Sequence, residues 1–292
     1  MYPAQTMTGD ARETGAATAL TPAMAEVVAY YTREPETVRL TVDAGGALEL
    51  ARMQELLLRH LPAAPALIAD IGGGAGMYAR WLAAAGYRVV LLDLVAAHTR
   101  LVRDAESERP AAPLAGIILG DARTLPLAQM CADAVLLLGP LYHLTERDDR
   151  LRALQEALRV LKPGGRVFAV GVSRFAGLFS GLYFEQMDDP AFLPLMWRGL
   201  RDGQHRNPTE KRYWTTAYFH HPDELRDEVA EAGFAIVDRV AVEGPQFAVR
   251  DLAAWWNDAR RRELLLEAIR AVEHEPTLLG LSSHVLVVGE RP

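Results

Sequence analysis

Residues 66–93, ALIADIGGGAGMYARWLAAAGYRVVLLD, decide the fold class of this chain. Their first apolar run is followed by Asp70, and Gly72, Gly74 and Gly76 then stand at alternate positions before a helical pattern. A second run, YRVVLLD, is rich in the aliphatic residues typical of a buried strand. A strand, a glycine-rich turn, a helix and a further strand in this order predict a βαβ unit.

The glycine-rich turn suits a ligand that carries an anionic group. Glycine lets the backbone approach a ligand without a Cβ clash, and the following helix N-terminus presents free N–H groups. The turn alone is ambiguous, because Gly74, Gly76 and Ala79 also satisfy the dinucleotide fingerprint G-x-G-x-x-A. Asp93, which ends the next strand, can accept hydrogen bonds from a ribose in either case. The turn does not by itself decide between a dinucleotide and another nucleoside cofactor.

Strands and helices continue to alternate outward from this unit. Gly45 and Gly46 are expected to interrupt the chain before a helix over 47–61. Another helix is expected over 147–161, ended by Lys-Pro-Gly-Gly, and one over 222–233 that begins at a proline. Further strands are expected at 115–121, 132–138, 166–172, 234–244 and 283–290. Strands joined by crossovers predict a parallel sheet in an α/β fold.

Three features together resemble the class I S-adenosylmethionine-dependent methyltransferases, over residues from about 65 to 173. The turn from Asp70 fills the family's acid-x-Gly-x-Gly-x-Gly pattern, whose loop holds the methionine moiety. Asp93 matches the acid that accepts hydrogen bonds from both ribose hydroxyls. Asp121 and Ala122, shortly before a Leu-Pro pair, match the acid that takes the adenine amino group and the backbone N–H that faces the ring.

The resemblance implies a Rossmann-like, doubly wound α/β fold whose seven-stranded sheet is mostly parallel, with an antiparallel C-terminal strand. It implies methyl transfer from S-adenosylmethionine to an oxygen, nitrogen or carbon atom of a small, partly apolar molecule. A catalytically silent cofactor-binding module and a nicotinamide-dependent oxidoreductase remain as alternatives. The residues implied to hold the cofactor are Asp70, Gly72, Gly74, Gly76, Asp93, Asp121, Ala122 and Leu138.

The chain divides into a short leader, a lid and one main domain. Residues 1–21 are rich in Ala, Thr and Gly, which predicts a disordered leader without the basic and apolar regions of a signal peptide. Residues 22–62 are expected to form a helical lid segment. Residues 63–292 are expected to form the methyltransferase domain, with an inserted cap at about 173–220 where the strand and helix alternation stops.

The loop after the fourth strand is the first place to look for catalytic groups, because ligands of doubly wound sheets lie outside the carboxyl ends of the strands. His143 is a candidate general base, since an imidazole titrates near neutral pH. A buried structural histidine is an equally good interpretation. Tyr142 is a candidate to orient the acceptor. A displacement at a sulfonium can also proceed by alignment and desolvation without a base.

Aromatic residues of the lid and the cap are candidates to hold the acceptor. The cap is aromatic enough to roof a largely apolar pocket, although it could instead pack as a small core of its own. Arg39 could hold an acidic group by a bidentate contact, but a surface ion pair explains it more simply. The candidate acceptor-binding residues are Tyr30, Tyr31, Arg39, Phe179, Tyr183 and Trp214.

Composition favours a small-molecule acceptor. The 292 residues carry a formal net charge of −7, so no global field attracts nucleic acid, and none is expected as partner. Cys131 is the single cysteine, and the adjacent His220 and His221 would point apart on a strand, so no metal site is expected. No stretch has the ~18 uncharged apolar residues of a membrane span. We expect a cytoplasmic monomer or homodimer without membrane contact.

Overall fold

The computed structural model describes residues 19–33, 37–207 and 212–292. The leader expected over 1–21 therefore falls almost wholly outside the described residues. The lid and the main domain fall largely within them, and the first described helix begins at Pro22. No helix in the described part of the chain is long and apolar enough to cross a membrane.

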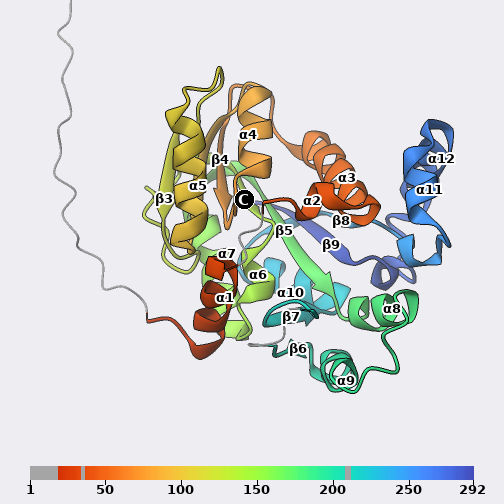
Figure 1. The fold of residues 1–292 in the computed structure, drawn as a ribbon. Helices are drawn as coiled ribbons and strands as arrows, with labels where there is room; N and C mark the ends of the chain where they lie inside the picture. The colour runs from red at the N-terminus through yellow and green to blue at the C-terminus, as the bar shows by residue number, and fades with distance from the viewer. Residues whose placement is uncertain (1–18, 34–36, 208–211) are drawn as a thin grey trace, which may run out of the picture.

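A twisted sheet forms the centre of the molecule (Figure 1). Seven strands follow the order β3-β2-β1-β4-β5-β9-β8, and within this path the antiparallel pairs are those made by β9. This confirms the expected mostly parallel sheet with an antiparallel C-terminal strand. The strands are β1 (Leu67–Ile71), β2 (Arg88–Asp93), β3 (Gly116–Leu119), β4 (Ala132–Leu137), β5 (Leu161–Ser173), β8 (Ala235–Ala241) and β9 (His284–Glu290).

Helices cover both faces of the sheet because successive strand residues point to opposite sides. In β1, Ile68 belongs to the core cluster that includes residues of α3, α4 and α5, whereas Ala69 belongs to the cluster that includes residues of α7 and α10. The strands are therefore apolar on both faces, as buried parallel strands are. The covering helices are α3 (Ala44–His60), α4 (Met77–Ala84), α5 (Ala96–Ser107), α7 (Arg147–Val160) and α10 (Pro222–Glu231).

The lid and two C-terminal helices lie around this core. Helices α1 (Pro22–Arg33) and α2 (Arg39–Val42) precede α3. Helices α11 (Leu252–Asn257) and α12 (Ala259–Val272) pack on α3 through a cluster around Leu48, at the opposite end of the molecule from β3 (Figure 1). Two single-turn 3-10 helices, η1 (Gln246–Ala248) and η2 (Leu279–Leu281), lie in the connections next to them.

The segment inserted after β5 adds strands to the sheet at the carboxyl end of β5. It contains α8 (Ala176–Tyr183), α9 (Phe192–Asp202), β6 (Gln204–His205) and β7 (Ala217–His220). Strand β7 pairs in parallel with the last two residues of β5, beyond the point where β4 ends. Figure 1 shows α8 and β7 beside the arrowhead of β5. The sequence pattern did not indicate this extra pairing, because β7 is only four residues long.

The predicted interruption at Gly45 and Gly46 is wrong. Helix α3 begins at Ala44 and runs through both glycines, with Asp43 as its N-cap accepting a 2.8 Å hydrogen bond from the Gly46 N–H. A Cβ on Gly46 would lie 2.2 Å from the carbonyl oxygen of Arg39. The glycine is needed there because α2 and α3 meet closely, and the Asp43 cap offsets the low helix propensity of the two glycines.

Candidate active site

Two cavities meet at the carboxyl ends of β1 and β4, where the strand order reverses. In open α/β sheets this switch point is where ligands bind. The loop cavity is lined by the glycine-rich turn, the ends of β1 and β2, the residues after β3 and β4, and α1. The cap cavity is lined by α1, α3, α6 (Pro140–His143), α8, β7 and the residues before β9. Four residues line both cavities: Tyr31, Arg39, Tyr142 and His143.

Asp70 places an unsatisfied carboxylate oxygen at the floor of the loop cavity. Its side chain is buried at the end of β1, and among the described residues Oδ2 has no hydrogen-bond partner. Burial, with a smaller contribution from the negative charge of Asp93, raises the pKa of Asp70 to about 7. A buried carboxylate oxygen without a donor is costly. The arrangement therefore favours a ligand that brings a hydrogen-bond donor or a positive charge.

Asp93 ties the glycine-rich turn to the second strand. Its Oδ2 accepts from the Gly74 N–H at 2.8 Å, and its Oδ1 accepts from the Val95 N–H at 2.8 Å. His98 on α5 lies 3.2 Å from the same Oδ1. A carboxylate has about four lone-pair sites, so capacity for a further hydrogen bond remains. Asp93 thus fixes the turn and can still accept from a ligand in the loop cavity that it lines.

Asp121 lies in the loop after β3 and is held by a neighbouring arginine. Arg123 is buried, donates from Nη2 to Asp121 Oδ2 at 2.7 Å and reaches Asp149 on α7 at 3.1 Å. The hydrogen bonds to Asp121 raise the pKa of Arg123 above its usual value and outweigh burial, which lowers it. The carboxylate of Asp149 adds to the increase. The fixed Asp121 and the backbone of Ala122 form one wall of the loop cavity.

Tyr31 of the lid and His143 of α6 are joined across the two cavities. The His143 Nδ1–H donates to the Thr216 carbonyl at 3.1 Å, because a carbonyl can only accept. In the neutral ring Nε2 then accepts from the Tyr31 hydroxyl at 3.1 Å. Tyr142 packs edge-on against His143, with ring centroids 4.7 Å apart. The candidate base is therefore a ring held at both nitrogens, with the Tyr31 hydroxyl attached to it.

The lid and the cap are also linked by charge. Glu26 on α1 accepts from Arg206 at 2.7 Å and from the Thr216 hydroxyl at 2.7 Å. Thr216 directly precedes β7 and also holds His143 through its carbonyl. One residue of the inserted segment therefore connects α1 with α6.

The structure brings most of the expected cofactor residues together. Asp70, Gly72, Gly74, Asp93, Asp121, Ala122 and Leu138 all line the loop cavity. Gly76 is not among the lining residues. It is the residue before α4, with a φ of 81°, and a Cβ there would lie 3.2 Å from Val102 of α5. Gly76 therefore serves the start of α4, where a positive φ is needed and α5 lies close by.

Most of the expected acceptor residues line the cap cavity, whose volume is about 460 Å³. Tyr30, Tyr31, Arg39, Tyr183 and Trp214 contribute directly. Phe179 does not, but its ring stacks on Phe247, which does line the cavity. Arg39 forms the ion pair considered from the sequence, a bidentate contact with Glu49 at 2.6 and 2.9 Å.

The two adjacent histidines of the cap do not meet. The His220 ring lies 3.4 Å from Glu228 of α10, inside the buried cluster that contains Arg150. His221 is the N-cap of α10, where its side chain accepts from the Asp223 N–H. His221 therefore lies at the start of a helix, whereas His220 lies in a buried cluster.

Sequence reasoning did not single out several residues of the site. His98 and Arg123 follow the key acids by five and two residues, so their proximity in sequence was an available indication. Glu243 and His284 are 41 residues apart and carry no such indication. Together with Glu49 they form the one group in the described part of the chain with metal-ligand spacing. All three line the cap cavity.

Comparisons with known proteins match the central part of the chain. Residues 69–169 match the model of a methyltransferase domain. The chain is 33% identical over 166 residues to a ubiquinone/menaquinone biosynthesis C-methyltransferase of Acidiphilium cryptum, covering 56% of this chain and 64% of that protein. It is 36% identical over 129 residues to a malonyl-[acyl-carrier protein] O-methyltransferase of Methylococcus capsulatus, covering 43% of this chain and 45% of that protein.

A solved structure matches more of the chain at lower identity. A putative S-adenosylmethionine-dependent methyltransferase from Listeria monocytogenes superposes with a TM-score of 0.56 and 17% identity, covering 84% of this chain and 99% of that one. This similarity concerns the fold. The aligned part spans a little under two thirds of the length of the first curated relative and less than half of the second. The matched domain model, over residues 69–169, contains most of the residues that line the loop cavity.

Proposed function

We propose that this chain, whose residues 69–169 match the model of a methyltransferase domain, is a class I S-adenosylmethionine-dependent enzyme that methylates a small, partly apolar molecule. The acceptor atom is an oxygen, nitrogen or carbon. The relatives named above methylate carbon in one case and oxygen in the other. The relatives therefore do not decide which atom this chain methylates. The single observation that supports methyl transfer is the set of residues that line the loop cavity.

The residues of the loop cavity fit S-adenosylmethionine. The unsatisfied Oδ2 of Asp70 suits the ammonium group of the methionine moiety. A Cβ built on Gly74 would meet no atom within 4 Å, so the turn leaves open space above its backbone. Asp93 would accept from the ribose hydroxyls, and Asp121 with the Ala122 backbone would bind the adenine edge. The cofactor supplies an electrophilic methyl group on a sulfonium.

The protein's own groups align the acceptor and exclude water. Tyr142 lies where both cavities meet, and its hydroxyl oxygen is 3.6 Å from a Cβ position at Gly139. The acceptor atom forms a bond to the methyl carbon, the methyl–sulfur bond breaks, and its electron pair stays on sulfur. For a hydroxyl or amine acceptor, the Tyr31 hydroxyl can take the proton while passing its own to His143 Nε2. This relay supports the proposed catalytic role of His143.

The first test is binding of adenosylhomocysteine by isothermal titration, with Asp93→Ala as the variant. We expect clear binding to the wild type and a large loss in the variant. Asp104→Ala is a matched control, since Asp104 is an exposed acid on α5 away from the loop cavity. Absence of binding to the wild type would overturn the cofactor assignment.

Turnover separates the enzyme from a silent binding module. Adenosylhomocysteine released from S-adenosylmethionine in the presence of candidate acceptors would support catalysis, and tight binding with no release for any acceptor would support the silent module. Titration with NAD and NADP tests the remaining alternative. The carboxylates of Asp70 and Asp121 disfavour a dinucleotide. We therefore expect that NAD and NADP do not compete with adenosylhomocysteine for binding.

The setting of the enzyme belongs to the proposal as well. A small-molecule acceptor agrees with the apolar cap cavity, and the net charge of −7 disfavours a nucleic-acid acceptor. The single cysteine suits a reducing compartment, which supports a cytoplasmic location. Size-exclusion chromatography with light scattering would decide between a monomer and a homodimer.

A further inference from the structure

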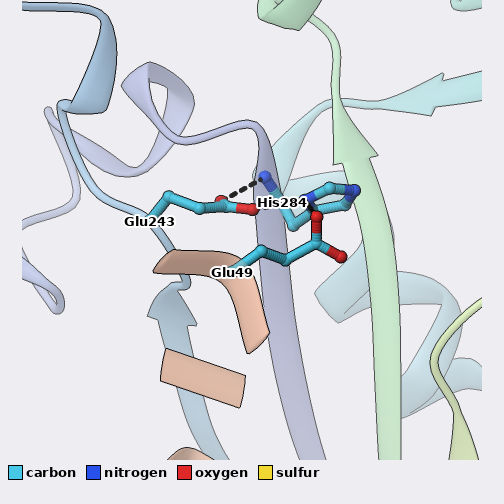
Figure 2. Close-up of side chains that lie close together, drawn as sticks. All are labelled: Glu49, Glu243 and His284. Carbon is cyan, nitrogen blue, oxygen red and sulfur yellow. Dashed lines mark hydrogen bonds and ion pairs between the residues drawn. The ribbon is translucent and has the colours of Figure 1, made fainter. Parts of the chain in front are cut away.

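His284 brings an ion-pair cluster into the wall of a cavity that is otherwise lined by aromatic and apolar residues and several polar ones. Its Nδ1 lies 2.5 Å from Glu243 Oε1, and its backbone N–H donates to Glu243 Oε2 at 2.9 Å. Glu49 of α3 approaches the same Nδ1 at 3.9 Å. Figure 2 shows both carboxylates on one side of the ring and the second ring nitrogen directed away from them. The three side chains come from three separate elements.

The surroundings of this cluster are largely aromatic. The other residues that line the cap cavity include Tyr183, Phe184, Trp214, Phe219 and Phe247. The side chain of Glu243 is 1% exposed and that of His284 is 14% exposed. A buried ion pair is seldom more stabilising than apolar residues of the same size. The presence of this ion pair in a pocket therefore indicates a role in binding a ligand.

The charges of the cluster determine which kind of ligand fits. Arg39 neutralises Glu49 through its bidentate contact. Burial lowers the pKa of His284, but the negative charges of Glu243 and Glu49 outweigh it and raise that pKa to about 9, against a smaller opposing effect of Arg39. The ring is then an imidazolium at neutral pH, with both nitrogens as donors. A metal ion would first have to displace that proton.

The His284 ring lies close to Tyr142, which lines both the cap cavity and the loop cavity. The Tyr142 ring lies 6.4 Å from the His284 ring, centroid to centroid, and Tyr142 also lines the loop cavity. An acceptor bound to His284 would thus extend past Tyr142 toward the glycine-rich turn. The polar contacts of the His284 ring to its carboxylate partners run through Nδ1, so Nε2 is the donor left for a ligand.

We propose that His284, held by Glu243 and Glu49, recognises an anionic oxygen of the methyl acceptor through Nε2–H. The acceptor class is a small aromatic or otherwise apolar molecule that carries a carboxylate, phenolate or enolate. This inference rests on the proposed function, and it names the acceptor chemistry of the same site. Glu243 and Glu49 are positioning residues, because they act through His284.

The test compares 2-naphthoate with its uncharged isostere 2-naphthamide, titrated into the protein with and without adenosylhomocysteine. We expect the wild type to bind 2-naphthoate at least tenfold more tightly than 2-naphthamide. His284→Gln is expected to abolish this preference while leaving the affinity for 2-naphthamide within about twofold. His274→Gln is the matched control, because His274 is an exposed histidine that contacts Asp238 and does not line the cap cavity.

A pH series provides a second measurement that a purely structural role would not produce. 2-Naphthoate stays ionised from pH 6 to 10, so its affinity should fall as pH rises through about 9, where His284 loses its proton. Glu49→Gln removes one nearby negative charge. We expect this variant to lose affinity for 2-naphthoate at a lower pH than the wild type. Glu49→Gln also keeps the inference testable if His284→Gln fails to fold.

The opposite results are equally specific. No preference for 2-naphthoate, or a preference that His284→Gln keeps, would overturn the inference. Micromolar binding of Mn²⁺ or Zn²⁺ that His284→Gln and Glu243→Gln both abolish would replace it with a metal site. Adenosylhomocysteine binding is measured separately, so failure of the cofactor assignment and failure of the His284 assignment give different results.

Discussion

The Tyr31 hydroxyl and His143 Nε2 lie 3.1 Å apart, although 112 residues separate them in the sequence. Tyr31 also packs against His98, with ring centroids 5.5 Å apart, and His98 contacts Asp93. A continuous series of contacts therefore runs from the expected ribose-binding acid to the candidate base. Helix α1 is thus one of the elements, with α2 and α6, that line both cavities.

Tyr31→Phe should loosen the lid and slow methyl transfer. The variant loses one hydrogen bond between α1 and α6, worth about 1 kcal/mol, which is about a fivefold change in a local opening equilibrium. We expect peptides covering 22–33 to exchange amide hydrogens about fivefold faster, measured by mass spectrometry, with β4 unchanged. Tyr87→Phe is the control, since Tyr87 donates to Pro62 outside both cavities. Unchanged exchange in α1 would contradict the role of this bond.

Asp70→Asn should change how stability depends on pH. The pKa of Asp70 is raised from 3.8 to about 7 in the folded protein, so its protonated form is favoured by folding. The resulting stability is complete below about pH 4 and is lost as pH rises to about 7. We therefore expect the free energy of unfolding of the variant, relative to the wild type, to increase from pH 4 to 7 and then level off. Urea unfolding at several pH values measures this.

The matched control for that series is Asp104→Asn. Asp104 is exposed on α5, so its substitution should leave the difference from the wild type independent of pH. If Asp70→Asn also gave a pH-independent difference, the carboxyl of Asp70 would have an ordinary pKa. That result would contradict the effect of burial on Asp70, whose Oδ2 has no hydrogen-bond partner among the described residues.

Asp93→Asn should weaken adenosylhomocysteine binding by about 10-fold to 100-fold, as expected for loss of charged hydrogen bonds worth about 1.5–3 kcal/mol. The amide keeps one acceptor oxygen, whereas Asp93 uses both oxygens to hold Gly74 and Val95. The turn should therefore become less ordered as well. Isothermal titration measures the affinity, and an unchanged dissociation constant would exclude Asp93 from the cofactor site.

Gly72→Ala and Gly74→Ala should differ in cost although both glycines have positive φ angles, 73° and 55°. A Cβ on Gly72 would lie 2.8 Å from Pro140 Cδ at the start of α6, whereas one on Gly74 meets nothing within 4 Å. We expect Gly74→Ala to cost about 1–2 kcal/mol of backbone strain and Gly72→Ala about 1–3 kcal/mol more from the clash. Urea denaturation at pH 7 compares them, and equal losses would contradict this account.

The amino-acid sequence by itself determined the βαβ unit, the glycine-rich turn and the acids at Asp93 and Asp121. These features depend on local patterns, since strands and helices have distinct periods and chain reversals need glycine. The same local reasoning was wrong at Gly45 and Gly46. There the deciding factor is the close approach of α2 to α3, which no local pattern reports.

Only the tertiary structure decided which side chains meet in the cap cavity. Glu49 lies on α3, Glu243 lies in the loop after β8, and His284 begins β9. Strand β7 joins the sheet through two residues of β5. Such contacts depend on how helices and strands pack over long separations in the chain. The loop cavity is formed mostly by residues between Asp70 and Leu144, with α1 and α2 added, whereas the cap cavity forms only after α1, the inserted segment and the C-terminal strand have come together.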